Sequence, residues 1–180
     1  KSSISFLLYF IIKQIKFDDF VNTVLEIPLL GLKNTFIGGV NTISTETLTT
    51  ISAINTPTLI LGTWTATDLE HFEANNNWSL KLKGTDPVDF RVTFDYVLEG
   101  TQDKEYRILL IKDSGGTLTT EFTQLRTIDR LSGSRDVAYY NGSTVIQMVQ
   151  DDFLYWEVEN ISGSENCTLE LDSRFIIEER

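Results

Sequence analysis

The sequence predicts an all-β protein: a jelly-roll β-sandwich of about eight strands, with an N-terminal helical extension and a short stem. Two observations predict this class. After Pro57, short runs of alternating apolar and polar residues follow one another with turn residues between them. No stretch after Pro57 has the period of an amphipathic helix, so the crossover helices that a parallel α/β fold requires are missing.

The first region, residues 1–30, is predicted to be an apolar helical anchor. Residues 5–12 read SFLLYFII, a run too short to span a bilayer, which needs about 20 apolar residues. A stripe at helical spacing follows, and Pro28 ends it. Three uses stay open: packing on its own domain or on sister subunits, insertion into another protein of a larger assembly, or anchoring in a membrane interface. The side chains predicted to make the anchor are Phe6, Leu7, Phe10, Ile11, Phe17, Phe20, Val21, Val24 and Leu25.

The second region, residues 31–57, is predicted to be a Thr- and Ser-rich stem or linker. Its aliphatic residues fit neither a heptad repeat nor a strict alternation. An extended stem, a short β-thread wound with copies of itself and a plain linker are therefore all consistent with the sequence.

The third region, residues 58–180, is predicted to be the jelly-roll head. Its strongest strand signal is the segment 88–98, where apolar residues alternate with mostly polar ones. Turns are expected at 113–116, at 132–134 and at Asn141-Gly142. The predicted strands are 58–66, 78–83, 88–98, 106–112, 118–128, 137–140, 144–149, 153–159 and 167–177.

The composition argues against several functional classes. The chain has 26 acidic and 15 basic residues and a net charge of −11, which disfavours nucleic acid as a partner. Its single histidine, His71, excludes multi-histidine metal sites and histidine-based triads within one chain. Its single cysteine, Cys167, excludes an intrachain disulfide and is expected to be a small core residue. We therefore predict no catalytic, cofactor-binding or metal-ligating residues, no cofactor and no enzymatic activity.

Paired carboxylates are the one arrangement that could still suggest hydrolysis of a glycoside. Glu157 and Glu159 are such a pair by spacing. They are expected on the solvent side of a strand that carries Trp156 and Val158 on its other face. Acidic residues are abundant throughout the chain, so this pair does not point to a hydrolase.

Large aromatic side chains are the remaining candidates for ligand contact. Trp64, Trp78 and Trp156 could stack on a sugar, although packing in the core accounts for most large aromatics. Tyr139 and Tyr140 are the candidate ligand contacts, because they are expected to be the most exposed aromatic pair.

Four Asn-X-Ser/Thr sequons occur in the chain, and they matter only if it passes through a eukaryotic secretory pathway. Their asparagines are Asn77, Asn141, Asn160 and Asn166.

The C-terminal half resembles a known group of proteins. The segments VDFRVTFDYVLEG (88–100) and EYRILLIKDSGG (105–116), together with the run 134–179, are similar to tumour-necrosis-factor-like jelly rolls of phage and viral fibre, spike and capsid-associated proteins. The segment 150–160 is the most characteristic: a polar turn with Asp, then alternating apolar residues, then Asn. The resemblance covers residues 77–180.

This resemblance implies a homotrimer in which one sheet of each subunit faces a threefold axis. It also implies a non-enzymatic virion structural protein at the particle surface, attached through its N-terminal segment to other virion proteins. Two alternatives remain: a receptor- or glycan-binding module that contacts a host-surface molecule, and a secreted, extracellular cytokine-like trimer.

Overall fold

All regular structure in the described part of the chain is β-strand, as the sequence predicts. The computed structural model describes residues 37–67, 72–75, 79–131, 135–171 and 173–180, within a compact unit that spans Phe36–Arg180. The anchor residues from Phe6 to Leu25 lie outside the described residues, as do His71, Asn77 and Trp78. The strands are β1 (Ile37–Glu46), β2 (Leu48–Thr49), β3 (Thr58–Leu59), β4 (Gly62–Thr67), β5 (Phe72–Asn75), β6 (Ser79–Leu82), β7 (Val88–Glu99), β8 (Glu105–Ser114), β9 (Thr117–Thr127), β10 (Asp129–Leu131), β11 (Arg135–Met148), β12 (Phe153–Asn160), β13 (Cys167–Leu169) and β14 (Arg174–Glu179).

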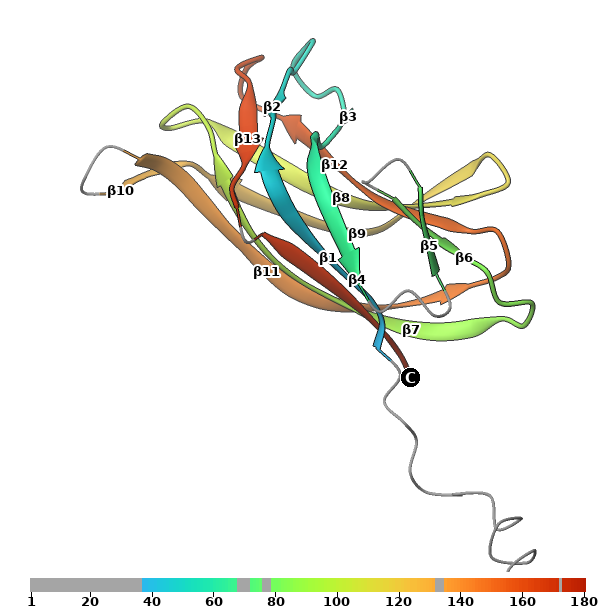
Figure 1. Cartoon of the computed structure of the whole chain (residues 1–180). Coiled ribbons are helices and arrows are strands. Elements are labelled where there is room, and N and C mark those ends of the chain that lie inside the picture. The colour runs from blue at the N-terminus through green and yellow to red at the C-terminus, as the bar shows by residue number, and fades with distance from the viewer. Residues whose placement is uncertain (1–36, 68–71, 76–78, 132–134, 172) are drawn as a thin grey trace, which may run out of the picture. The chain divides into compact units, whose positions relative to one another are not determined.

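The strands form two antiparallel sheets that enclose one core (Figure 1). The first sheet has the order β10-β11-β7-β14-β1-β4, and β13 joins β2 to the end of β7. The second sheet has the order β5-β6-β12-β8-β9, with β3 paired to β12. The chain crosses between the sheets repeatedly: β7 lies in the first, β8 and β9 in the second, and β11 in the first again. This connectivity is that of a jelly-roll sandwich, so the predicted fold class is confirmed.

The predicted stem is wrong from residue 37 onward, because β1 is an interior strand of the first sheet. It pairs with β14 on one side and with β4 on the other, and Ile43 is buried opposite Trp64. The register of β1 shifts between Ile37 and Gly39 and again between Ile43 and Thr45. Such bulges break the two-residue alternation by which a strand is recognised in sequence. The head therefore includes residues that the sequence assigned to the stem.

The predicted turn at Asn141-Gly142 is also wrong, because β11 runs unbroken through it. Residues 137–148 pair in continuous register with β7. Gly142 lies opposite Phe94, and a Cβ at this position would lie 2.9 Å from Phe94 Cζ and 3.3 Å from Phe122 Cζ. The absence of a side chain is thus required by the close approach of two rings. The predicted strands 137–140 and 144–149 are one strand.

The predicted final strand, 167–177, is divided into β13 and β14. Between them the backbone N–H of Glu170 donates to Val97 O at 2.9 Å, and the Val97 N–H donates to Ser173 Oγ at 3.1 Å. The regular pairing with β7 is interrupted between the two strands, and both β13 and β14 pair with β7. The turn predicted at 113–116 is confirmed, with positive φ angles at both of its glycines.

One aromatic cluster joins the two sheets. Trp156 of β12 contacts Phe94 and Tyr96 of β7, with ring centroids 4.7 and 4.9 Å apart. Phe175 of β14 and Trp64 of β4 complete the cluster around Tyr96 and Trp156. All five side chains are buried, and burial of each contributes about 1.5–3 kcal/mol to folding.

Replacing Gly142 with alanine should destabilise the head, since the new Cβ would press against the packed rings of Phe94 and Phe122. We expect the free energy of unfolding to fall by about 1–3 kcal/mol, the usual cost of overpacking a core. Chemical denaturation of the full chain measures this change. Gly84→Ala is the matched control, because its Cβ would meet nothing closer than Leu82 Cδ1 at 3.9 Å. Equal stability of the two variants would contradict the packing role of Gly142.

Candidate functional site

The outer surface of the first sheet is the candidate site, because three neighbouring strands present an ordered set of side chains away from the core. Successive residues of a strand point to opposite faces, and the burial of β7 alternates accordingly. Tyr139 of β11 lies opposite Val97 of β7, and Asn141 lies opposite Asp95. We call this surface the β7–β11–β14 face. Its residues are Asp89, Arg91, Thr93, Asp95, Val97, Tyr139, Asn141, Ser143, Val145, Gln147, Arg174, Ile176 and Glu178.

The β7–β11–β14 face carries exposed apolar side chains. Tyr139 is 55 % exposed and Val145 is 43 % exposed. Val97 and Ile176 are partly exposed on the same face. Among the described residues, several large apolar side chains are exposed, and Tyr139 is the one aromatic side chain among them. Tyr139 lies opposite Val97, and Val145 lies six residues further along β11, so the apolar side chains of this face are spaced along it.

A hollow of about 350 Å³ lies in this face, next to the position of Tyr139. Asp95 and Arg174, which lie opposite each other in register, bring an acid and a base to it. Among the described residues, none of the ion pairs within 4.0 Å involves either of these two side chains. The lining residues are Thr93, Phe94, Asp95, Asn141, Gly142, Arg174 and Ile176.

The β7–β11–β14 face carries charges of both signs. Its bases are Arg91 and Arg174, and its acids are Asp89, Asp95 and Glu178. Its net charge of −1 on 13 residues is about the same per residue as the −11 of the 180-residue chain. Acids and bases on one face can pair across an interface between two copies.

Of the two tyrosines predicted to contact a ligand, Tyr139 is exposed and Tyr140 is not. Tyr140 is 0 % exposed, and its hydroxyl donates to the backbone oxygen of Tyr106 at 2.9 Å. Burial raises the pKa of Tyr140 well above its usual range. The prediction for Tyr140 is wrong because adjacent residues of an unbroken strand point to opposite faces. Trp64 and Trp156 are buried as well, so they do not form a platform for a sugar.

The second sheet does not present the open carboxylate pair that the sequence suggested. Glu159 is buried, and its Oε1 lies 2.6 Å from Nη1 of Arg107. The prediction that Glu159 faces solvent is wrong, because this ion pair is packed on the sheet. Glu157 is partly buried, and burial, with a smaller effect of the nearby Glu159 charge, raises its pKa.

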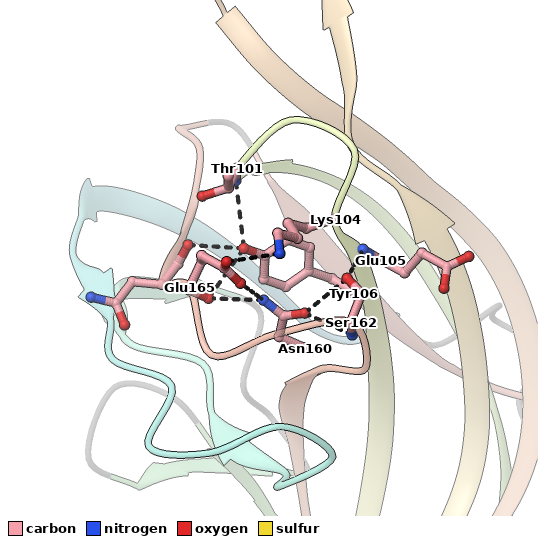
Figure 2. Close-up of polar contacts among 8 residues, drawn as sticks. Thr101, Lys104, Glu105, Tyr106, Asn160, Ser162 and Glu165 are labelled. Atoms are coloured by element: carbon pink, nitrogen blue, oxygen red, sulfur yellow. Dashed lines mark hydrogen bonds and ion pairs between the residues drawn. The ribbon is translucent and has the colours of Figure 1, made fainter.

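A polar cluster ties two loops together at one end of the sandwich (Figure 2). It joins the loop 100–104, between β7 and β8, to the loop 161–166, between β12 and β13. The hydroxyl oxygen of Tyr106 lies 3.1 Å from the backbone oxygens of Glu165 and Asn166, to which it can donate. Nζ of Lys104 lies 2.8 Å from Oε1 of Glu165.

The buried side chain of Asn160 completes this cluster. Its Nδ2 donates to the backbone oxygen and to Oε2 of Glu165, at 3.2 and 3.1 Å. Its Oδ1 accepts from the backbone N–H of Ser162 at 3.0 Å. The hydrogen bond from Lys104 is the main cause that lowers the pKa of Glu165. Because these donors and acceptors satisfy one another, the cluster holds the loops in place and leaves few polar atoms for a ligand.

Neither a metal-binding cluster nor an activated thiol occurs in the part of the chain that the structure describes. Within the described residues, no three His, Cys, Asp or Glu side chains are placed to hold a metal ion. Cys167 is buried as predicted, and burial raises the pKa of its thiol to about 12, so it stays protonated at neutral pH. The described residues contain no helix long and apolar enough to cross a membrane.

The likeness to solved structures defines the fold as a tumour-necrosis-factor-like jelly roll. No protein-family model matches the sequence, and no curated relative does. Eiger TNF from S. frugiperda superposes with a TM-score of 0.57 at 9 % identity, covering 80 % of this chain and 92 % of that one. Two crystal structures of murine APRIL, at pH 5.0 and pH 8.0, superpose with TM-scores of 0.52 and 0.53 at 13 % and 12 % identity. Each covers 79 % of this chain and 98 % of the other. At this identity the likeness establishes the fold alone.

The sequence did not identify the hollow or the packing role of Gly142. A usable signal was present, because Tyr139, Asn141 and Ser143 continue the alternation that Val145 and Gln147 then maintain. Reading that period through the glycine would have joined the two predicted strands and placed these side chains on one face.

Replacing Glu165 with glutamine should flatten the pH dependence of stability in acid. The pKa of Glu165 is lowered from 4.5 in the folded chain, so its charge stabilises the fold above that value, and this contribution is lost as the pH falls below it. We expect the wild type to lose more stability than Glu165→Gln between pH 5 and pH 3, measured by denaturant unfolding at each pH. Lys104→Met, which removes the partner, should behave like Glu165→Gln. An unchanged pH profile in both variants would show that the pair contributes nothing.

Proposed function

We propose that the chain is a non-enzymatic structural protein of a virus particle whose jelly-roll head assembles as a homotrimer. The observation that carries the proposal is the β7–β11–β14 face, where the exposed Tyr139 lies beside a hollow lined by side chains of both charges. The resemblance to fibre and spike heads implies that one sheet faces a threefold axis. The outer face of the first sheet has the properties that this arrangement requires.

The same proposal gives residues 1–30 the role of attaching the head to the particle. The apolar run 5–12 and the stripe at helical spacing from Phe17 to Leu25 suit insertion into other virion proteins. The head would then stand on the particle surface, where its loops could also meet a host receptor or glycan.

A second candidate is an extracellular, cytokine-like trimer, and the likeness to Eiger TNF and murine APRIL favours it. It needs the same assembly face. It differs in location, since such a protein would act outside the cell and free of any particle.

The sequons favour the virion candidate over the secreted one. Asn160 is 0 % exposed, and its amide nitrogen, the atom that would carry a glycan, is hydrogen-bonded to Glu165. Asn166 accepts a hydrogen bond from the Ile51 N–H at 2.9 Å, and Asn141 lies in the hollow of the proposed assembly face. Glycans are bulky and belong on free surface. Modification at Asn160 or Asn141 would therefore oppose folding or assembly, and a chain that assembles outside the secretory pathway avoids this conflict.

The full chain should be a trimer in solution, and Ile176→Glu should dissociate it, because the variant replaces an apolar contact at the assembly face with a carboxylate that loses its water on burial. Sedimentation equilibrium measures the mass of both. Leu118→Glu is the matched control, since Leu118 is 61 % exposed on β9 of the second sheet. A monomeric wild type, or dissociation caused equally by Leu118→Glu, would refute assembly through this face.

The virion protein and the extracellular cytokine-like trimer differ in where the chain is found. We expect mass spectrometry of purified particles from the source of the sequence to detect this chain, with Asn141, Asn160 and Asn166 unmodified. Recovery of the chain only from particle-free medium, with a glycan on Asn160, would overturn the virion proposal and support the cytokine-like one. The glycosylation state is read from intact peptide masses with and without glycosidase treatment.

A further inference from the structure

We propose that Tyr139 of one copy inserts into the hollow of the next copy, so that the trimer is closed by three identical knob-in-hole contacts. This inference rests on the proposed assembly through the β7–β11–β14 face. It goes further, because it names the side chain that carries the contact and the site that receives it.

The size and position of the hollow suit an aromatic ring from another copy. Its volume of about 350 Å³ is ample for a phenol side chain. Tyr139 is not among the residues that line the hollow of its own copy, and it lies opposite Val97, one pair further along the face than Asn141 and Asp95. More than half of its surface is open. The large exposed aromatic and the hollow are thus separate features of one face, and each lacks a partner within the copy.

The lining of the hollow matches the chemistry of tyrosine. Ile176 supplies apolar contact, and the outward-facing Thr93 and Asn141 border it. The guanidinium of Arg174 suits the face of an aromatic ring, and the carboxylate of Asp95 suits the phenol hydroxyl as an acceptor. Neither charge is engaged in an ion pair among the described residues, so both are available.

The same contact can be made in two symmetries. In a twofold dimer each Tyr139 would enter the hollow of the other copy, and in a ring each enters the hollow of the next copy. The threefold ring comes from the proposed assembly and not from the placement of Tyr139. A dimeric wild type would therefore overturn the ring.

A double-mutant cycle on the full chain tests the inference. Tyr139→Ala removes the knob, and Thr93→Phe fills the hollow from an exposed position on β7. Each should weaken association at least about tenfold, as loss of a central aromatic contact does. The double variant should be little weaker than either single one, because both remove the same contact. Leu118→Ala, an exposed apolar residue on the second sheet, should leave the association unchanged.

The outcomes separate the inference from the assembly on which it rests. A monomeric wild type overturns both. A trimer that dissociates in Ile176→Glu but tolerates Tyr139→Ala keeps the assembly face and overturns the knob. A trimer weakened by Tyr139→Ala but not by Thr93→Phe also overturns it, since it indicates that the tyrosines contact one another at the axis.

A second measurement does not depend on the folding of Thr93→Phe. Nitration by tetranitromethane, followed by peptide mass spectrometry, should spare Tyr139 in the wild-type trimer and modify it in Ile176→Glu. Tyr96, Tyr106 and Tyr140 are buried within each copy and serve as unreactive references. Equal nitration of Tyr139 in both proteins would overturn the insertion.

Discussion

The contact between Trp156 and the ring pair Phe94 and Tyr96 is the constraint on which the rest of the head depends. It joins the second sheet to the centre of β7, with centroid distances of 4.7 and 4.9 Å. Because side chains alternate along a strand, fixing Phe94 and Tyr96 inward also fixes Thr93 and Asp95 outward. The core contact thereby determines which residues make the assembly face.

The same packing explains why β11 carries a glycine in its middle. Phe94 and Phe122 lie edge to face with centroids 4.9 Å apart, and they occupy the space that a side chain at residue 142 would need. Residue 142 faces the core, as Tyr140 and Ile146 of the same strand do, so the glycine makes room for these two rings inside the sandwich. The unbroken course of β11 therefore depends on the packing of the core at this point.

The alternating segments of the sequence were sufficient to predict the fold class, and the irregular ones were not. The β7 segment shows six inward residues at a period of two, and it appears in the structure with that register. β1 is interrupted by two register shifts, so its pattern looked like a stem. The Asn141-Gly142 dipeptide is typical of a turn, but here the glycine is needed because the rings of Phe94 and Phe122 lie close to residue 142. This requirement depends on residues distant in the sequence, so the dipeptide alone could not indicate it. The same unbroken strand buries Tyr140 and exposes Tyr139, so half of the predicted tyrosine pair was wrong.

The excess of acids bears on how copies of the chain can meet. At physiological salt, charges on opposing surfaces act over about 8 Å, so acidic regions repel one another as two copies approach. The β7–β11–β14 face has about the same net charge per residue as the whole chain, so net charge alone does not single it out. The order of its charges matters more, because Arg174 lies opposite Asp95 and Glu178 lies opposite Arg91. Acids of one copy therefore meet bases of the next only in some registers, which makes an assembly through this face selective for orientation.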